Sequence, residues 1–463
     1  MRNTLPVFRK LTSFDFAARI RLNAAMQANR LKIIWEKFRV GNFWRRKSVR
    51  LAAALFCALL LAVTVKPVGN SVHRTALNLE SPWQPLHPLT AGKNTGEVFG
   101  FAPYWAFNQM GGIDFSTLTT LAYFGVPVSP TGDLDTYDQG YITFQSPQAT
   151  DLFRRAHENG TSVVLTLTQM NNANITALLD DPDAQNNAIN QAVSEVQSRG
   201  IDGINVDMEY DGDPGPEYRD KFTNFVANLD SAMHQANPHA KVTVSVYADS
   251  VKDPKIYDIA RLWSVSDGIF MMAYDFATAG SDTAMPTSPL YGYKEGTYWY
   301  DVSTAVDDFL TKMPANKLIL GIPWYGYNYL VYQPGVDVPT YNSWWAGPVS
   351  QTYAAFQENV ATDRPDIIAT DQGWDNLGEV GWKAYYSTES GAWRMIFLED
   401  SRSLSLKYDF AKAKHLAGVG IWALGFDGAQ GKELWQVLKD KFGSKLADHS
   451  VVTKAIAERG SYE

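Results

Sequence analysis

Residues 202–209 read Asp-Gly-Ile-Asn-Val-Asp-Met-Glu, and this stretch decides the fold. Its apolar and polar side chains alternate: Ile204, Val206 and Met208 against Asn205, Asp207 and Glu209. Since successive strand side chains point to opposite faces, the alternation predicts a β-strand with one apolar and one polar face. Alternate strand residues lie about 6.6 Å apart, so Asp207 and Glu209 can bracket one small reacting group. Such a polar row on a buried face is unfavourable unless it is hydrogen-bonded or used in function.

The segments on both sides of this strand have a helical pattern. Apolar residues recur at helical spacing over 189–196, and Gly200 stands where a helix C-terminal glycine belongs. The same spacing returns over 222–233. Helix, strand and helix make an α/β unit in which Glu209 ends the strand. In α/β barrels, that carboxyl end carries the active site.

Eight segments have the length and composition of strands, and helical patterns separate them. They are Glu97–Tyr104, Thr119–Val126, Ser162–Thr168, Gly203–Glu209, Lys241–Val246, Gly268–Tyr274, Leu318–Pro323 and Gly418–Ala423. Several are continuous apolar runs, as expected for parallel strands covered on both faces. The pattern predicts an α/β fold, the (β/α)8 TIM barrel. The aromatic-rich segment at about 324–402 is too long for one loop and helix, so it predicts a small α+β insertion between strands 7 and 8.

Composition divides the chain into five parts. Residues 1–50 hold 13 Lys and Arg against 2 Asp and Glu, which predicts a basic cytoplasmic tail. Residues 51–65 are almost wholly apolar, and 66–95 form a proline-containing linker. The barrel domain is expected over 96–445, and a polar tail over 446–463.

The apolar segment 51–65 predicts export. Its 15 residues are few for a spanning helix, which needs roughly 17–25, and they suit a signal-peptide core. No Ala-x-Ala cleavage site follows, which favours an uncleaved signal-anchor: a single pass through the membrane with the barrel outside. Cleavage followed by secretion remains the alternative.

Charge and composition exclude several function classes. The net charge of −8, with +11 on residues 1–50, leaves −19 on the rest of the chain, so nucleic acid is excluded as a partner of the barrel. The single Cys57 allows no disulfide framework. The 7 His are scattered without ligand spacing, which predicts no metal site. The 14 Trp and 23 Tyr suit either sugar binding or a large core.

Side chains at three predicted strand ends suit glycoside hydrolysis, which needs a proton donor to the leaving oxygen. Glu209 has the position of that acid, and Asp207 is its neighbour on the same face. Tyr274 and Asp275 end strand six, unless they are a packed tyrosine and a helix N-cap. Trp422 ends strand eight, as an aromatic floor or as core.

These segments resemble glycoside hydrolase family 18, the chitinase family. The stretch 202–209 is similar to that family's strand-four motif, and 272–275 (Met-Ala-Tyr-Asp) to its strand-six motif. Residues 321–326 and 420–422 resemble its strand-seven motif and its strand-eight tryptophan. The four motifs stand in the family's order, and the likeness covers roughly residues 97–440.

The resemblance implies a retaining, substrate-assisted hydrolysis of β-1,4 bonds beside an N-acetylated sugar, without metal or cofactor. It implies that Glu209 is the acid and then the base, and that Asp207 orients the acetamido group. It implies further that Tyr274 bonds the acetamido carbonyl, that Asp275 holds the sugar and that Trp422 stacks beneath it. The expected substrate-binding residues are Trp422, Tyr104, Trp105, Tyr325 and Asp202. For Tyr104, Trp105 and Tyr325, core or rim packing is the alternative to sugar stacking.

The chain departs from the family pattern at two places. Asn205 stands where the family usually has Asp; we count it with the catalytic residues and expect Asn205→Asp to preserve or raise activity. The strand-three Ser-x-Gly-Gly motif is missing, and Thr166 is a candidate to supply a hydroxyl to the buried carboxylates. These departures resemble the bacterial branch of spore-cortex and cell-wall hydrolases.

Three functions remain open. The first is an active hydrolase of N-acetylglucosamine-containing polysaccharides or oligosaccharides, with chitin, peptidoglycan and N-linked glycan as possible substrates. The second is a non-catalytic, chitinase-like glycan-binding protein. The third is an unrelated barrel that keeps only the architecture. Intact Glu209 and Asp207 favour the first over the second, and the four ordered motifs argue against the third.

Overall fold

The structure is a computed structural model that describes residues 96–341, 347–361, 364–428 and 431–443. All of these lie in the compact unit Ser81–Glu463. The predicted tail 1–50, apolar segment 51–65, linker 66–95 and polar tail 446–463 fall outside the described residues. Within the described part of the chain, no helix is long and apolar enough to cross a membrane.

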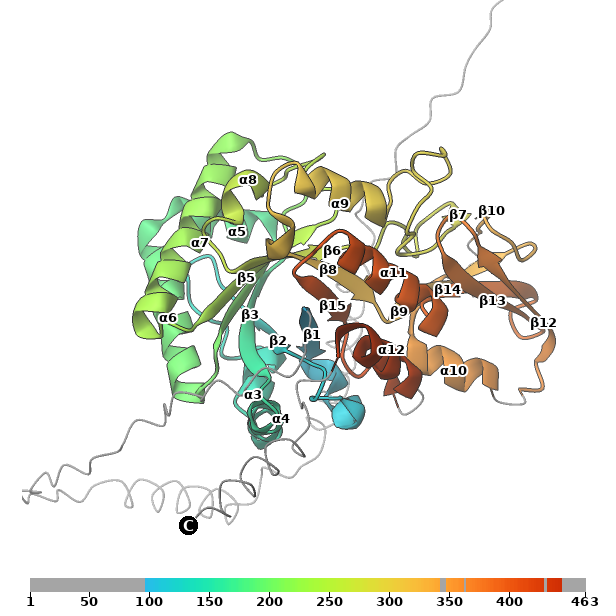
Figure 1. The fold of residues 1–463 in the computed structure, drawn as a ribbon, viewed down its shortest axis with the longest axis horizontal. Helices are drawn as coiled ribbons and strands as arrows, with labels where there is room; N and C mark the ends of the chain where they lie inside the picture. Colours follow the sequence, from blue (N-terminus) through green and yellow to red (C-terminus); the bar gives the residue numbers. More distant parts are fainter. Residues whose placement is uncertain (1–95, 342–346, 362–363, 429–430, 444–463) are drawn as a thin grey trace, which may run out of the picture. The chain divides into compact units, whose positions relative to one another are not determined.

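Eight parallel strands close into a barrel (Figure 1). They are β1 (Glu97–Pro103), β2 (Thr120–Pro127), β3 (Ser162–Gln169), β4 (Gly203–Met208), β5 (Lys241–Tyr247), β6 (Gly268–Met272), β8 (Leu318–Pro323) and β15 (Gly418–Trp422). Their order around the barrel is β1-β15-β8-β6-β5-β4-β3-β2. Every predicted strand is present, with ends shifted by at most two residues, so the predicted TIM barrel is confirmed.

Helices follow most of the strands. They are the 3-10 helix η2 (Tyr104–Gly112), α3 (Gln139–Phe144), α4 (Pro147–Glu158), α5 (Asn172–Asp180), α6 (Pro182–Arg199), α7 (Pro216–Ala236), α8 (Ile259–Leu262), α9 (Val302–Leu310), the 3-10 helix η3 (Ala315–Lys317), α11 (Ser401–Ala413) and α12 (Lys432–Phe442). Gly200 ends α6 with a left-handed φ of 61°, as its place in the sequence predicts.

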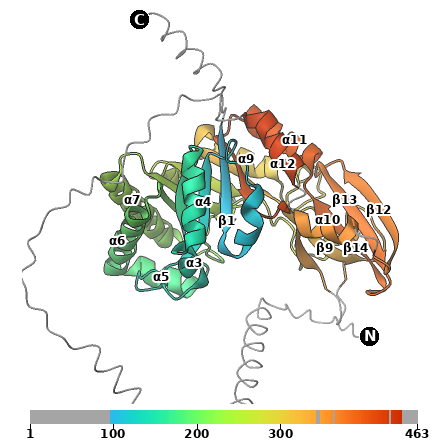
Figure 2. The ribbon, with the colours of Figure 1, turned by 90° about the horizontal axis from the view of Figure 1, so that it is seen from below.

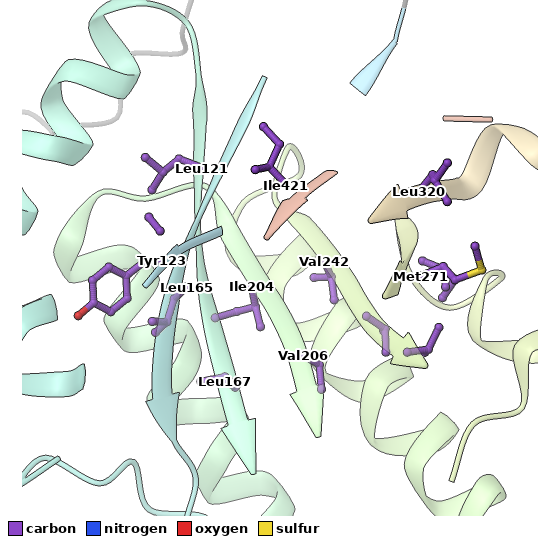
Figure 3. Close-up of a cluster of buried hydrophobic side chains, with 14 of the residues drawn as sticks. Leu121, Tyr123, Leu165, Leu167, Ile204, Val206, Val242, Met271, Leu320 and Ile421 are labelled. Carbon is purple, nitrogen blue, oxygen red and sulfur yellow. The ribbon is translucent and has the colours of Figure 1, made fainter. Parts of the chain in front are cut away.

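The alternation along β4 separates two cores. Ile204 and Val206 belong to the large cluster between strands and helices, which Figure 3 shows together with Leu165 and Val242. A smaller cluster fills the inside of the barrel, where Phe270 packs on Phe99 and Phe101. The polar face of β4 therefore points into the barrel, as the period of two requires.

The predicted insertion between the seventh and eighth barrel strands is confirmed. It contains β9 (Tyr325–Val331), β10 (Val338–Pro339), β11 (Val349–Thr352), α10 (Tyr353–Ala361), β12 (Ile367–Asp375), β13 (Val380–Ser387) and β14 (Ala392–Leu398). Five strands form an antiparallel sheet in the order β11-β9-β14-β13-β12. Figures 1 and 2 show these elements gathered on the side of the barrel where α11 and α12 lie.

The connection that follows β6 packs against the insertion. Its short strand β7 (Thr283–Ala284) pairs with β10. The hydroxyl of Tyr298 bonds Asp375 at the end of β12, and Leu290 N donates to Gly378 O at 2.9 Å. The insertion and this connection therefore form one wall beside the carboxyl ends of β6 and β8.

Candidate active site

A pocket of about 160 Å³ opens at the carboxyl ends of the barrel strands. It is lined by Phe101, Asp207, Glu209, Ser245, Tyr247, Met272, Tyr274, Asp275, Tyr325 and Trp422. Six of these residues are predicted site residues, and they come from four separate parts of the sequence. A larger hollow of about 330 Å³ lies on the insertion and contains none of the predicted site residues. The smaller pocket is therefore the candidate active site.

Asp207, on the polar face of β4, is 3% exposed. Burial raises the pKa of its carboxyl well above the usual range, and the nearby charge of Glu209 raises it further. Its Oδ1 has no hydrogen-bond partner within the described part of the chain. A buried acceptor without a partner is costly, so the atom is poised to bind a polar group of a ligand.

Glu209 is the first residue beyond β4, and its main-chain N–H donates to Gln169 O at 2.9 Å. Its Oε2 accepts a hydrogen bond of 2.6 Å from the hydroxyl of Tyr247. Burial raises the pKa of the Glu209 carboxyl; the bond from Tyr247 lowers it, and the charge of Asp275 raises it. The net shift is upward, which suits a carboxylic acid that must hold a proton until it reacts.

Asp275 lies at the other side of the pocket, with a left-handed φ of 60°. Its Oδ1 accepts hydrogen bonds from the hydroxyls of Tyr325, Tyr327 (2.9 Å) and Thr287 (3.2 Å). Burial raises the pKa of this carboxyl, and the three hydroxyls oppose that rise. Tyr274 keeps its proton, because burial and neighbouring carboxylates raise its pKa well above the usual range.

Trp422, the last residue of β15, forms an aromatic floor. Its ring lies 4.7 Å from that of Phe124 and 5.3 Å from that of Phe101, both edge to face. The ring of Tyr274 stacks at 6.4 Å. These rings and that of Trp105, at 6.4 Å, fix the plane of the indole, which suits stacking against a sugar ring.

Residues 97–427 match the family described as Glycosyl hydrolases family 18. The chain belongs to glycosyl hydrolase family 18. The matched region covers the barrel and the insertion, and the predicted family is confirmed.

Curated relatives support the same family at low identity. The di-N-acetylchitobiase of Homo sapiens is 26% identical over 350 residues, 71% of this chain and 80% of the relative. The cortical fragment-lytic enzyme of Bacillus subtilis is 22% identical over 311 residues, 65% and 64% of the two chains. YdhD of Bacillus subtilis is 24% identical over 310 residues, 66% of each chain. The chain therefore spans slightly less than two thirds of the length of some of these relatives.

Solved structures share the fold. The Ostrinia furnacalis Group IV chitinase superposes with a TM-score of 0.64 at 19% identity, over 74% of this chain and 98% of that chain. The Bacillus megaterium spore cortex-lytic enzyme SleL superposes with a TM-score of 0.57 at 19% identity, over 75% of this chain and 74% of that chain. At this identity, the likeness establishes the barrel alone.

Two predicted aromatic residues of this family 18 chain lie outside the pocket lining. Trp105 is 52% exposed, and its ring lies 6.4 Å from that of Trp422. Tyr104 is half-buried against the outer core. Trp105 thus stands at the mouth of the pocket, whereas Tyr104 supports it with an edge-to-face contact at 4.9 Å.

Asp202 was expected among the substrate-binding residues, and the structure places it away from the pocket. It precedes β4, so it lies at the amino end of the barrel strands, opposite to the pocket. Its Oδ2 accepts a bond of 2.7 Å from Val163 N and lies 2.7 Å from His157 Nε2. The carboxylate therefore ties β3 and α4 to β4, as a structural group.

Asn205 is fully buried below the pocket and does not line it. Its Nδ2 donates to Ser245 Oγ at 3.0 Å, and its Oδ1 accepts from Thr243 Oγ1 at 2.9 Å. Its amide thus links β4 to β5 and bonds no carboxylate. The predicted hydroxyl contact from Thr166 is not formed either, because Thr166 Oγ1 has no partner among the described residues.

Four lining residues were not predicted as site residues from the sequence: Phe101, Ser245, Tyr247 and Met272. Tyr247 is the most informative, because it touches Glu209 directly. It is the last residue of β5, one position beyond the predicted strand. The rule that barrel strand ends carry function would have selected it.

One group of side chains away from the pocket has metal-ligand spacing. Donor atoms of Asp230, His234 and Asp267 lie within 4.8 Å of one another. His234 Nδ1 faces its own helix, 2.9 Å from Asp230 O. The group joins the end of α7 to the start of β6, at the amino end of the barrel and away from the carboxylates.

Proposed function

We propose that this family 18 chain is a retaining glycoside hydrolase that cleaves β-1,4 bonds in N-acetylglucosamine-containing glycans by substrate-assisted catalysis. The observation that carries the proposal is the pair on β4: Glu209 with a raised pKa, and Asp207 with an unpartnered buried oxygen. One group holds a proton, and the other can receive the N–H of an acetamido group. No second pair in the pocket combines these properties among the described residues.

The reaction proceeds in two steps. Glu209 gives its proton to the glycosidic oxygen while the carbonyl oxygen of the substrate's own 2-acetamido group attacks C1, so the C1–O bond breaks and an oxazolinium ion forms. Asp207 accepts the acetamido N–H on its unpartnered oxygen and so orients the group for attack. Glu209, now ionised, then takes a proton from water as the water attacks C1, which restores the acetamido group with retained configuration.

The remaining pocket residues bind the reacting sugar. Tyr274 keeps its proton, so its hydroxyl can donate a hydrogen bond to the acetamido carbonyl. Asp275, held by tyrosines of the insertion, accepts bonds from sugar hydroxyls. Trp422 carries the apolar face of the ring. The pocket of about 160 Å³ takes the reacting sugar, and the rest of the glycan extends outside it.

The names of the relatives point to N-acetylglucosamine as the shared unit. They include di-N-acetylchitobiase, endochitinase and cortical fragment-lytic enzyme. A solved Cycas revoluta family 18 chitinase carries (GlcNAc)4. Chitin and peptidoglycan both contain this unit, so both are substrates to test.

The test incubates the full chain with chito-oligosaccharides and, separately, with peptidoglycan, beside Glu209→Gln. The glutamine keeps the shape and the acceptor for Tyr247 but cannot donate the acid proton. Products are read by mass spectrometry, and their initial anomer by NMR. We expect cleavage by the wild type, β-anomeric products and a loss of about 10²–10⁴-fold or more in the variant. Binding without cleavage by both proteins would make the chain a glycan-binding relative.

A further inference from the structure

The connection that follows β5 holds the candidate acid from below. Tyr247 ends β5 and donates its hydroxyl hydrogen to Oε2 of Glu209 at 2.6 Å. Ten residues later, Tyr257 donates to the main-chain oxygen of Met208 at 2.8 Å. The two tyrosine rings lie edge to face, 6.0 Å apart. The end of β5 and the connection after it therefore fix both the side chain of Glu209 and the backbone that precedes it.

A buried lysine supports Tyr247 from the same loop. Lys255 Nζ lies 5.1 Å from the centre of the Tyr247 ring, and Lys255 is only 9% exposed. Its ammonium bonds Asp253 at 2.8 Å and Asp249 at 3.4 Å. A cation over an aromatic face attracts the ring, and more strongly when the cation is shielded from water.

The backbone of Lys255 adopts a φ of 50°, in the left-handed region that non-glycine residues rarely occupy. Its carbonyl accepts a bond of 3.1 Å from Arg219 Nη1 on α7. Backbone strain of this kind persists only where the surrounding structure fixes it. The surroundings of Lys255 therefore hold its backbone in this conformation.

These contacts have a consequence for proton delivery. A phenol that donates to Oε2 leaves Oε1 as the oxygen that carries the proton of neutral Glu209. We propose that Tyr247, held by Lys255, is a positioning residue that presents the acid proton of Glu209 from Oε1 only. The proposal rests on the proposed function, since it assigns the route of the proton in the first step.

The charges around Glu209 set its response to pH. Asp207 faces it from β4, and Asp275 and Tyr274 face it from the end of β6. Tyr247 faces it from β5, and Asp211 lies near Tyr247. The carboxylates favour the protonated acid, whereas the hydroxyl of Tyr247 favours the ionised form and so lowers the pKa of Glu209.

The main test is Tyr247→Phe, which removes one hydroxyl and keeps the ring under Lys255. Without the bond, both oxygens of Glu209 can carry the proton and its side chain can rotate, so we expect kcat to fall about tenfold with KM within about twofold. The pKa of Glu209 should rise, so the alkaline limb of the kcat/KM profile should move to higher pH. An unchanged limb would overturn the proposal, even with a lower kcat.

Lys255→Met and Lys252→Met form a matched pair for the role of the cation. Lys255→Met should move the alkaline limb of the kcat/KM profile to higher pH, as Tyr247→Phe does. The reason is that the ring of Tyr247 loses the shielded cation that holds it. Lys252 lies on the same loop but faces the rings of Tyr293 and Tyr300, at 5.2 and 5.0 Å. Its substitution should leave the limb in place, and equal shifts in both variants would exclude a specific role for Lys255.

A readout independent of turnover separates this proposal from the proposed function. The infrared band of the protonated carboxyl that Glu209→Gln removes can be titrated in the wild type and in Tyr247→Phe. A higher pKa in Tyr247→Phe would support the positioning role even if no glycan were cleaved. Equal pKa values would overturn it. Tyr257→Phe serves as the structural control, with an expected loss of thermal stability and an unshifted titration.

Discussion

Tyr327, on the first strand of the insertion, donates a hydrogen bond of 2.9 Å to Oδ1 of Asp275, which follows barrel strand β6. Tyr325 on the same strand bonds the same oxygen. The two groups are about fifty residues apart in sequence, and they meet because β9 leaves the barrel directly after β8. The insertion therefore completes the candidate site as well as forming its wall.

Tyr325→Phe and Tyr327→Phe should each weaken the site without unfolding it. Loss of a hydroxyl that favours the ionised form should raise the pKa of Asp275. A hydrogen bond to a charged group contributes about 1.5–3 kcal/mol, so we expect kcat/KM to fall by about tenfold or more. Tyr329→Phe is the control, because Tyr329 lies on the same face but bonds Met285 O at 3.2 Å. An equal loss in the control would refute the role given to the two tyrosines.

Asp202→Ala should affect stability and leave catalysis intact. Its carboxylate bonds Val163 N and His157 at the amino end of the barrel. Removing it leaves the partly buried N–H of Val163 without its partner, which costs about 1–3 kcal/mol of unfolding free energy. Urea unfolding measures the loss, and kcat should stay within about twofold of the wild type. A folded variant without activity would restore Asp202 to the substrate-binding residues.

Asn205→Asp now has a different expected outcome from the one the sequence predicts. The position is fully buried, and its partners Ser245 and Thr243 are uncharged. A carboxyl there would have a raised pKa in the folded state. The pKa of an unfolded Asp is about 3.9, so above this pH the folded variant binds more protons than the unfolded one. Its free energy of unfolding therefore falls as the pH rises.

The variant should therefore be less stable than the wild type at pH 7, and the difference should shrink towards pH 5. Unfolding free energies of both proteins at the two pH values measure this. Activity should not rise above that of the wild type at neutral pH. A variant of equal stability and higher activity would support the original prediction that Asn205 belongs to the proton network.

The sequence predicted the barrel because period-two and helical patterns are local properties of the chain. It placed Asp207, Glu209, Tyr274, Asp275 and Trp422 together because parallel strands end at one face of a barrel. It could not separate Asp202 from Glu209, since both belong to one motif although they lie at opposite ends of a strand. Tyr247 was missed because the predicted strand ended one residue before it. Tyr327 was missed because its partner Asp275 comes from another element, and no local pattern records such a pairing.

Trp105→Ala should distinguish a sugar platform from rim packing. The indole is 52% exposed, beside Trp422 at the mouth of the pocket. Stacking on a sugar ring contributes about 1 kcal/mol, so KM for long chito-oligosaccharides should rise about fivefold. KM for the shortest cleaved oligosaccharide should change less, because that substrate reaches fewer residues outside the pocket. Tyr332→Ala is the control, since this 75% exposed tyrosine lies on the insertion and lines no part of the pocket. If KM is unchanged for every length, Trp105 is only a packed rim residue, and the cleft extends from Trp422 in another direction.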